Sequence, residues 1–596
     1  MTNEPNPPTW PESVIIVHGH KDEAAKAKLN QTQDAWLEEH STFTCDYHFS
    51  NRRWAVLFAP DVYHDVEFEV GYYVQVAGLG TSPEDVQFHT AKGPYVPSLN
   101  RHLHKGGSGT CLDTFWRSGE NFANHAEDGM TWAVSQASPL RRVHVAKDLY
   151  LHDKDAYASG GHLANSVVHG HTHFGGQQQY LSRNVELGNG TSGGAWGMVY
   201  VGCSGQVPEP AKGNATSAAI TVVETPPVRV EKPYVAMQTD GHTFELRVPQ
   251  ATYDKADAVR PLIHGDLEEA RDFSRVRVAT STDSTASLQE ALDAGKDLVL
   301  SPGIYPLAQT LQIRMDHQVI LGLGLATLVS PLGAPCIHVH PGTAGVRIAG
   351  VMLEAPVVHG TIENATHWSL LEWGTEGVQD LGNPQSPGSM FDVFCRVGGA
   401  TLPEARDRIS IDTMVRIHSG HVIGDNLWLW RADHAELGHE EDVNCPHVSP
   451  VFWQTEEGEF TVGTGIEVTG NDVTMYGLAV EHASGHQTVW KGERGSVYFY
   501  QCEFPYDVGA DFGTAGYRGY LVDENVETHQ AYSVGIYSNF RNEKVKVSTA
   551  IEHPDKDTIR IENPFTVHLD NHGDIESLVN GKGRPAVLQG VPTRLD

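Results

Sequence analysis

The sequence predicts an all-β protein built from two tandem parallel β-helices that lie side by side with a cleft between them. Short strand-like segments recur at intervals of roughly 20 residues, separated by glycine, asparagine and aspartate. Glycine makes up 60 of 596 residues, above its usual share of roughly 7%, as expected for a chain with many tight turns. One pattern of strands also occurs twice along the chain, which indicates two similar halves.

The predicted strands are short and rich in β-branched and aromatic residues. Examples begin at Val276, Val346 and Ser496, where the chain reads VRVAT, VRIAGVML and SVYFYQCEF. Helical periodicity is confined to a few stretches, of which 22–39 and 287–294 are the best. A β-sandwich of about 100 residues would have to be repeated several times, and no such period is present. A parallel β-helix fits this spacing, because each coil buries its inward-facing side chains against the next coil.

The repeated pattern consists of a Pro-x-x-Tyr segment followed by a Gly-Leu-Gly triplet. Tyr63 corresponds to Tyr305, and the triplets begin at Gly78 and Gly322. Each copy follows one of the two helical segments, an arrangement typical of the start of a β-helix. A stretch rich in Pro and Thr, with weak patterning, separates the copies. We therefore expect an N-terminal β-helix with a leading helical segment over 1–225, a linker region over 226–284 and a C-terminal β-helix over 285–596.

The charge of the chain argues against nucleic acid and membrane partners. Its 42 Lys and Arg against 75 Asp and Glu give a net charge of −33, whereas phosphate binding needs clustered basic residues. No apolar run approaches the roughly 20 residues of a membrane span. Seven dispersed cysteines without CxxC spacing argue against a disulfide framework or a zinc ribbon. A neutral ligand such as a glycan is compatible with this composition.

Two glutamates stand out in the predicted C-terminal β-helix. Glu481 and Glu503 are 22 residues apart, close to the length of one coil, so their carboxyl groups are expected on adjacent rungs of one face. Such a pair can divide acid and base roles, as glycosidases require. Apolar neighbours are expected to keep one of them protonated near neutral pH, namely Phe499, Phe504, Tyr506 and Trp490. The alternative is a pair of ordinary solvated strand residues.

A glutamine-rich segment is the second candidate feature. Gln177 and Gln179 would point to the same face of an extended strand, and Ser204 follows Gln179 by 25 residues, again near one coil. Amides and hydroxyls both donate and accept hydrogen bonds, so they suit sugar hydroxyls or a held water molecule. The alternative is a glutamine ladder that only stabilises the solenoid.

Histidines and acidic loops could in principle hold a metal ion. The chain reads HGHTH over 169–173, but strand alternation would place these rings on one exposed face without a partner carboxylate at helical spacing. The acidic segment 439–442 lacks the pattern of a calcium loop. Both are expected to be solvated. Nucleotide-binding motifs and the GxSxG motif of esterases are absent from the sequence.

Several blocks, in their order and spacing, resemble glycoside hydrolase family 55. They are FEVGYYVQVAGLG from Phe68, GGQQQYLSRN from Gly175, LSPGIYPL from Leu300, LWLWRADH from Leu427 and FYQCEFPYD from Phe499. Members of this family are exo-β-1,3-glucanases, or laminarinases, built from two tandem right-handed β-helices. The resemblance implies that fold and the release of glucose from β-1,3-glucan.

The resemblance also implies roles for the candidate residues. Glu503 matches the general acid of the family, and Glu481 matches the second active-site glutamate, which helps to position the attacking water. Gln177, Gln179 and Ser204 match polar residues that hold this water. The family acts with inversion, so no covalent glycosyl-enzyme is expected, and its general base is not a simple facing carboxylate.

Aromatic side chains are expected to line the sugar site. Tyr506 matches a residue of the glucose subsite in the family, and Trp faces stack well on pyranose rings. Three tryptophans are weaker candidates for such platforms, namely Trp453, Trp196 and Trp490. The expected partner is a β-glucan polysaccharide, with no cofactor, no metal and a monomeric chain. The first residues lack the basic and apolar regions of a signal peptide, whereas the family is usually secreted, so an extracellular location is the expectation and a cytoplasmic one the alternative.

Two other functions remain open at this point. A polysaccharide lyase on the same scaffold would need Ca²⁺ or a basic residue to neutralise a uronate, which the glutamate pair does not supply. A non-catalytic glycan-binding protein would bind without turnover. Linkage specificity other than β-1,3 is a further alternative.

Overall fold

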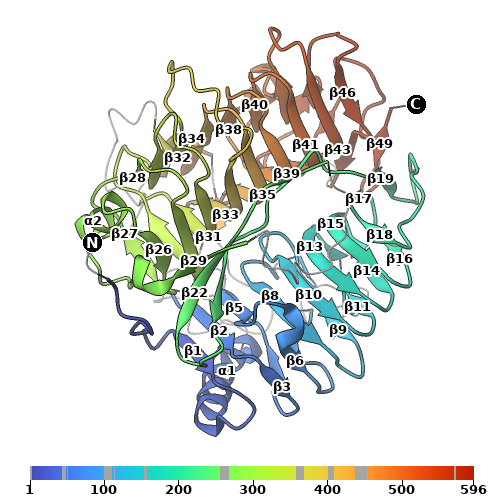
Figure 1. The fold of residues 1–596 in the computed structure, drawn as a ribbon. Helices are drawn as coiled ribbons and strands as arrows, with labels where there is room; N and C mark the ends of the chain where they lie inside the picture. The colour runs from blue at the N-terminus through green and yellow to red at the C-terminus, as the bar shows by residue number, and fades with distance from the viewer. Residues whose placement is uncertain are drawn as a thin grey trace.

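Two stacks of parallel strands lie side by side, one formed by the N-terminal part of the chain and one by the C-terminal part (Figure 1). The computed structural model describes residues 3–42, 49, 51–98, 111–112, 114–153, 157–254, 268–356, 368–399, 409–435, 453–455, 457–569 and 572–595. The prediction of an all-β fold with two tandem β-helices is confirmed. The acidic segment 439–442 lies outside the described residues.

The main sheet of the N-terminal β-helix is parallel throughout its central path. Its strands follow one another in space as β1 (Val14–Val17), β2 (Trp54–Phe58), β5 (Val74–Gly78), β8 (Ser118–Asn124), β10 (Leu140–Val145), β13 (Gly161–Val168), β15 (Gln179–Leu187), β17 (Gly197–Val201) and β19 (Ala219–Val223). A smaller sheet contains β9 (Met130–Thr131), β11 (Leu149–Tyr150), β14 (Thr172–Gln177) and β12 (Tyr157–Ala158). Inward-facing apolar side chains of both sheets form one buried core.

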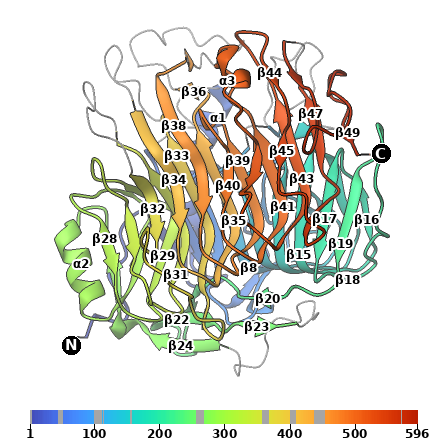
Figure 2. The ribbon, with the colours of Figure 1, turned by 90° about the horizontal axis from the view of Figure 1, so that it is seen from above.

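The C-terminal β-helix repeats this plan on a larger scale. Its main sheet runs through β25 (Val276–Ala279), β26 (Asp297–Leu300), β29 (Val319–Val329), β31 (Arg347–Glu354), β33 (Gly388–Val397), β35 (Val422–Arg431), β39 (Thr474–Glu481), β41 (Gly495–Glu503), β43 (His529–Ser538), β47 (Phe565–His568) and β49 (Thr593–Arg594). The second sheet runs through β28 (Leu311–Ile313), β30 (Ile337–Val339), β32 (Ser369–Trp373), β34 (Ile409–Ile417), β38 (Phe460–Val468), β40 (Thr488–Trp490), β42 (Tyr520–Val522) and β45 (Ile551–Glu552). Figure 2 shows the rungs of both stacks from above.

The internal repeat corresponds to the same local structure at the start of each β-helix. Helix α1 (Glu23–Thr42) connects β1 to β2, and helix α2 (Thr285–Asp293) connects β25 to β26. The Tyr63 hydroxyl donates to the carbonyls of Val17 and Ala59, at 3.1 and 2.7 Å. The Tyr305 hydroxyl makes the equivalent pair of bonds to the preceding two strands, at 3.0 and 2.7 Å. In the described part of the chain, no helix has the length and apolar character needed to cross a membrane.

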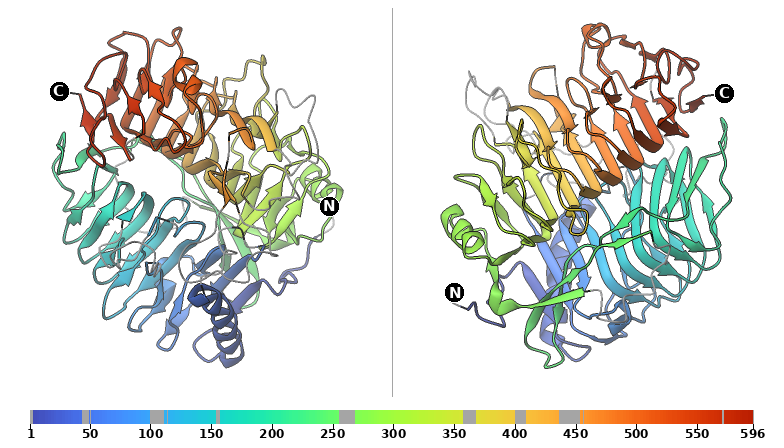
Figure 3. Two further views of the ribbon diagram at one scale, coloured as in Figure 1. Left: turned by 180° about the vertical axis from the view of Figure 1, so that it is seen from behind. Right: turned by 45° about the horizontal axis from the view of Figure 1, so that its top comes forward.

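The segment expected to be a weakly patterned linker folds into antiparallel strands. Strands β21 (Tyr234–Met237), β22 (Phe244–Pro249) and β24 (Glu268–Asp272) form one sheet, and β20 (Val228–Arg229) pairs with β23 (Thr252–Tyr253). Their apolar side chains join a buried cluster that contains residues of both β-helices. The linker strands cross the two stacks, as the views in Figure 3 show. The chain end also returns to the N-terminal stack, where Arg594 Nη2 donates to the Trp196 carbonyl at 2.7 Å.

Buried charges join the two β-helices along their line of contact, which we call the seam. Arg141 on β10 contacts Asp392 at 2.7 Å and Asp425 at 2.8 Å, and both carboxylates belong to the C-terminal β-helix. Arg183 on β15 contacts Asp425 at 2.7 Å and Glu231 of the linker region at 2.8 Å. All five side chains are almost completely buried. Opposite charges at these distances fix how the two halves sit against each other.

Candidate active site

The two predicted glutamates lie side by side on neighbouring strands. Glu481 ends β39, Glu503 ends β41, and the two are direct partners in the parallel register. Neighbouring strands are about 4.8 Å apart and residues in register point to the same face, so the two side chains leave the sheet together. Glu481 is 3% exposed and Glu503 is 7% exposed. The expectation that one coil separates them is confirmed.

Glu481 is held by donors from both β-helices. Gln136 Nε2 of the N-terminal half donates to its Oε1 at 2.9 Å, and Trp428 Nε1 on β35 donates to its Oε2 at 2.8 Å. An indole N–H and an amide NH₂ can only donate. Hydrogen bonds of this kind stabilise the ionised form of a carboxyl group.

Glu503 has a different environment. The Tyr506 hydroxyl donates to its Oε2. Burial raises the pKa of Glu503 to about 7, against the opposing effect of the Tyr506 hydrogen bond. Burial and repulsion from Glu503 raise the pKa of Glu481 above its ordinary range, against the effect of its two donors. Two buried carboxyl groups on neighbouring strands resist being ionised together, and the two N–H donors on Glu481 favour the ionised form of that residue.

The structure separates the two predicted glutamines. Gln177 ends β14 and Gln179 begins β15, so the chain turns between the two sheets and they do not share a face as expected. The Gln177 amide donates to the carbonyls of Val134 and Leu151, at 2.8 and 2.7 Å, inside the N-terminal β-helix. In the described part of the chain no hydrogen bond joins Gln177 to either glutamate. Its role in holding water stays a prediction.

Gln179 crosses the seam toward the glutamate pair. Its Nε2 donates to the carbonyls of Tyr500 and Ser533, both at 3.2 Å, and its Oε1 accepts from the Tyr537 hydroxyl at 2.7 Å. Tyr537 is the register partner of Glu503 on β43. Gln179 therefore fixes the tyrosine beside Glu503, and its own amide is fully buried.

Gly535 makes room for Gln179 in this arrangement. A Cβ atom at Gly535 would lie 2.5 Å from Gln179 Oε1 and 2.7 Å from the Phe565 ring. We expect Gly535→Ala to destabilise the protein by about 1–3 kcal/mol, as overpacking does, and to displace Tyr537. Denaturant unfolding of Gly535→Ala, Gln179→Ala and the double variant checks this. The double variant should lose clearly less than the sum of the single losses, and strict additivity would contradict the proposed clash.

Ser204 does not lie one coil after Gln179, so that expectation is wrong. The register partner of Gln179 on the next strand is Gly197. Ser204 begins the short strand β18 (Ser204–Gly205) and pairs with Glu186, far along β15 from Gln179. The coil there is shorter than 25 residues, because only the short strand β16 (Thr191–Gly193) of the second sheet lies between β15 and β17.

The aromatic candidates for the sugar site lie in different parts of the structure. Trp490 is fully buried in the core of the C-terminal β-helix and its Nε1 donates to the Gly492 carbonyl at 3.1 Å, so it cannot serve as a sugar platform. Phe504 lies in the same core. Trp196 is half-buried and its ring is 5.3 Å from that of Tyr537. Trp453 belongs to β37 (Trp453–Gln454), and its side chain lies outside the described residues.

Sequence reasoning missed three side chains of the site, Gln136, Trp428 and Tyr537. Trp428 could have been found, because strand alternation in LWLW places Trp428 and Trp430 on the face of β35 that neighbours Glu481. Tyr537 could have been found only from the register of β43. Gln136 is 345 residues from Glu481, and nothing local in the sequence indicates their contact.

The predicted exposure of the histidines over 169–173 is confirmed, because His169 is exposed and His171 and His173 are partly exposed, whereas the nearby His162 is buried. His173 Nε2 lies 3.1 Å from Asp148 Oδ2, and His171 Nδ1 lies 2.9 Å from the Asn189 carbonyl. Both rings are partly exposed on the outer face of the N-terminal β-helix. Within the described ranges, no group of three or more His, Cys, Asp or Glu side chains is arranged to hold a metal ion.

Comparisons with known proteins show the family of the chain. Residues 276–503, which end at Glu503, match the family model of the LAM55 pectate lyase-like domain. The chain is 31% identical over 552 residues to an exo-beta-1,3-glucanase of Streptomyces sp. (strain SirexAA-E / ActE), a match that covers 90% of this chain and 82% of that protein.

Two solved structures have the same fold. The structure of sacteLam55A from Streptomyces sp. SirexAA-E superposes with a TM-score of 0.83 at 28% identity, over 100% of this chain and 99% of that chain. A variant of sacteLam55A in complex with glucose superposes with a TM-score of 0.81 at 27% identity, with the same coverage. The chain therefore belongs to glycoside hydrolase family 55.

Proposed function

We propose that the chain is an inverting, exo-acting β-1,3-glucan hydrolase that releases glucose from laminarin-type glucans. The observation that carries this proposal is the buried glutamate pair on neighbouring strands, in which burial raises the pKa of Glu503 to about 7 and two N–H groups donate to the Glu481 carboxyl group. The exo-beta-1,3-glucanase relative and the glucose complex of the sacteLam55A variant support the choice of substrate.

In the proposed reaction Glu503 protonates the glycosidic oxygen as the bond to the anomeric carbon breaks. Glu481 orients a water molecule that attacks this carbon and replaces the leaving sugar, and the proton that this water releases replaces the one that Glu503 gave up. Inversion is proposed because glycoside hydrolase family 55 acts in this way, and Glu481 then positions water instead of attacking the sugar itself. Because Gln136 and Trp428 hold both oxygens of Glu481, the carboxylate is fixed as an acceptor for water. A monomer without cofactor is sufficient for these steps.

Product analysis tests this proposal. Incubation with laminarin should release glucose as the first product, and proton NMR should show its α-anomer before mutarotation. The β-anomer would contradict inversion, and longer oligosaccharides as first products would contradict exo-action. An unsaturated product that absorbs in the ultraviolet would indicate a lyase instead. Binding to the glucan without any product would indicate a glycan-binding protein.

The pH dependence of catalysis should report the proton on Glu503. Because Glu503 must be protonated to act as acid and its pKa is about 7, we expect kcat/KM to fall as the pH rises through this value. The Tyr506 hydroxyl lowers the pKa of Glu503, so Tyr506→Phe should move this decline to higher pH. Tyr532→Phe, on the same sheet but bonded to Gln530, is the control and should leave it in place. A decline that stays fixed or moves down in Tyr506→Phe would contradict the assignment.

A further inference from the structure

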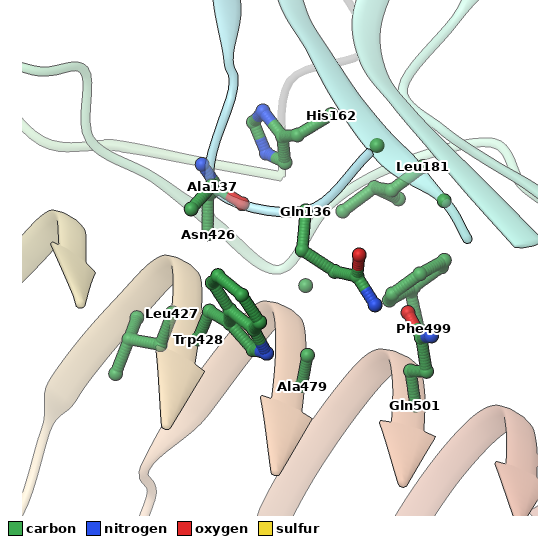
Figure 4. Close-up of a pocket in the computed structure, with 13 residues that line it drawn as sticks. Gln136, Ala137, His162, Leu181, Asn426, Leu427, Trp428, Ala479, Phe499 and Gln501 are labelled. Carbon is green, nitrogen blue, oxygen red and sulfur yellow. The ribbon is translucent and has the colours of Figure 1, made fainter. Parts of the chain in front are cut away.

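A small cavity lies in the seam behind Glu481. Its walls come from both β-helices and include Gln136, His162, Trp428, Phe499 and Gln501 (Figure 4). Gln136 and Trp428 are the two side chains that donate to Glu481. The cavity therefore lies next to the candidate active site, because two of its wall residues hold the Glu481 carboxyl group.

Gln501 faces this cavity with an unsatisfied amide. It lies two residues before Glu503 on β41 and is fully buried. Both Nε2 and Oε1 lack a hydrogen-bond partner among the described residues, and so does the buried Nδ1 of His162. An unpaired buried amide is costly, because its donors and acceptors have lost their hydrogen bonds to water. Such a cost in a folded protein points to a ligand that supplies the missing donors and acceptors.

The size of the cavity matches water. The room available to water centres is about 20 Å³, and one water molecule needs roughly 10–15 Å³ on this measure. Gly160 brings the opposite wall close to the amide, since a Cβ atom there would lie 3.3 Å from Gln501 Oε1 and 2.6 Å from the Gln179 carbonyl oxygen. A sugar is too large for this space. Water is small enough and can both donate to Oε1 and accept from Nε2.

We propose that this cavity is a binding site for one or two ordered water molecules, held by Gln501, which fix Gln136 and thereby the direction of the Glu481 carboxylate. Gln501 is then a positioning residue that acts through water and Gln136 without touching substrate. This role rests on the proposed function, whereas the water site itself does not. The N-terminal β-helix supplies Gln136, so the water also couples the two halves at the point where the reaction takes place.

Crystallography of the wild-type protein tests the water site directly. Density for one or two water molecules within hydrogen-bond distance of both Gln501 amide atoms is expected. A dry cavity, or a Gln501 amide bonded to protein groups, would overturn the proposal. In the Gln501→Met variant, which keeps the length of the side chain without its polar atoms, this density should disappear.

Kinetics tests the positioning role. Small displacements of a reacting group can cost up to about 100-fold in rate, and we expect Gln501→Met to lower kcat by about tenfold with KM changed less than about twofold. Gln501→Asn keeps the amide and should recover most of kcat. The control is Gln318→Met, because Gln318 is another buried glutamine of the same β-helix whose amide donates to the Leu292 and Lys296 carbonyls. Its kcat should be unchanged.

The outcomes separate this inference from the proposed function. A folded Gln501→Met protein with wild-type kcat would overturn the positioning role even where water is seen. Should Gln501→Met not fold, Gln501→Leu, which also lacks the amide, carries the same test: a kcat lowered by about tenfold is expected, and a wild-type kcat would contradict the positioning role. A wild-type protein that hydrolyses no β-glucan would contradict the proposed function and leave the crystallographic result on the water standing.

Discussion

Replacing Glu503 by Gln is expected to lower kcat on laminarin by about 100- to 10,000-fold, the usual contribution of a general acid. The amide has nearly the same shape as the carboxyl group and can still accept from the Tyr506 hydroxyl. It cannot release a proton to the glycosidic oxygen. Because Glu503 is buried next to Glu481, a permanently neutral amide avoids the cost of ionising both groups as the pH rises, so the variant should be at least as stable as the wild type.

Substrates with different leaving groups make this prediction specific. An aryl β-glucoside whose phenol leaves without protonation should lose much less rate in Glu503→Gln than laminarin does. Glu562→Gln, an exposed position on β46 (Ile559–Glu562) of the same sheet, is the matched control and should keep full activity on both substrates. A folded Glu503→Gln protein with near-normal laminarin hydrolysis would exclude Glu503 as the acid.

The sequence predicted those features that repeat with a regular period. Tyr63 and Tyr305 could be matched because each caps the same strand–helix–strand unit, and the structure shows the same pair of hydrogen bonds in both. The register of Glu481 and Glu503 followed from their separation, since strands β39 and β41 are joined by a coil of ordinary length. Local patterning is sufficient wherever the coil length is constant.

Predictions failed where the chain turns between sheets or where the coil length changes. Gln177 and Gln179 were treated as one extended strand, but the corner between β14 and β15 sends their amides in different directions. Ser204 was placed by an assumed coil length, although Gly197 occupies the rung next to Gln179. Trp490 lies on β40 of the second sheet, where its side chain faces the core. Turn lengths and corner positions are not set by strand periodicity.

Contacts across the seam were beyond sequence reasoning altogether. Gln136 meets Glu481, and Arg141 meets Asp392, over separations of 345 and 251 residues. No periodic pattern links such positions, because each β-helix builds its coils independently of the other. The active site nevertheless depends on these contacts, since one of the two donors to Glu481 comes from the N-terminal half.

Replacing Asp425 by Asn is expected to destabilise the protein by about 3–5 kcal/mol, the cost of breaking a buried ion pair. Asp425 is completely buried and contacts Arg141 and Arg183 from the other β-helix, at 2.8 and 2.7 Å. The amide keeps the shape but leaves two buried guanidinium groups short of one negative charge. Asp472→Asn is the matched control, because its pair with Arg494 is partly exposed, and its loss should stay below about 1 kcal/mol.

The ion pair and a purely steric effect differ below about pH 3.9, where the contribution of the ion pair shrinks and a steric difference persists. Burial alone would raise the pKa of Asp425, but the charges of Arg183 and Arg141 hold this pKa below its usual range. A lowered pKa means that the stabilisation is complete above the unfolded value of about 3.9 and is lost only as the pH falls below it. The difference in denaturant midpoint between wild type and Asp425→Asn should therefore stay constant between about pH 5 and 8. A difference that fades within this window, or one no larger than that of Asp472→Asn, would show that the seam does not depend on the charge of Asp425.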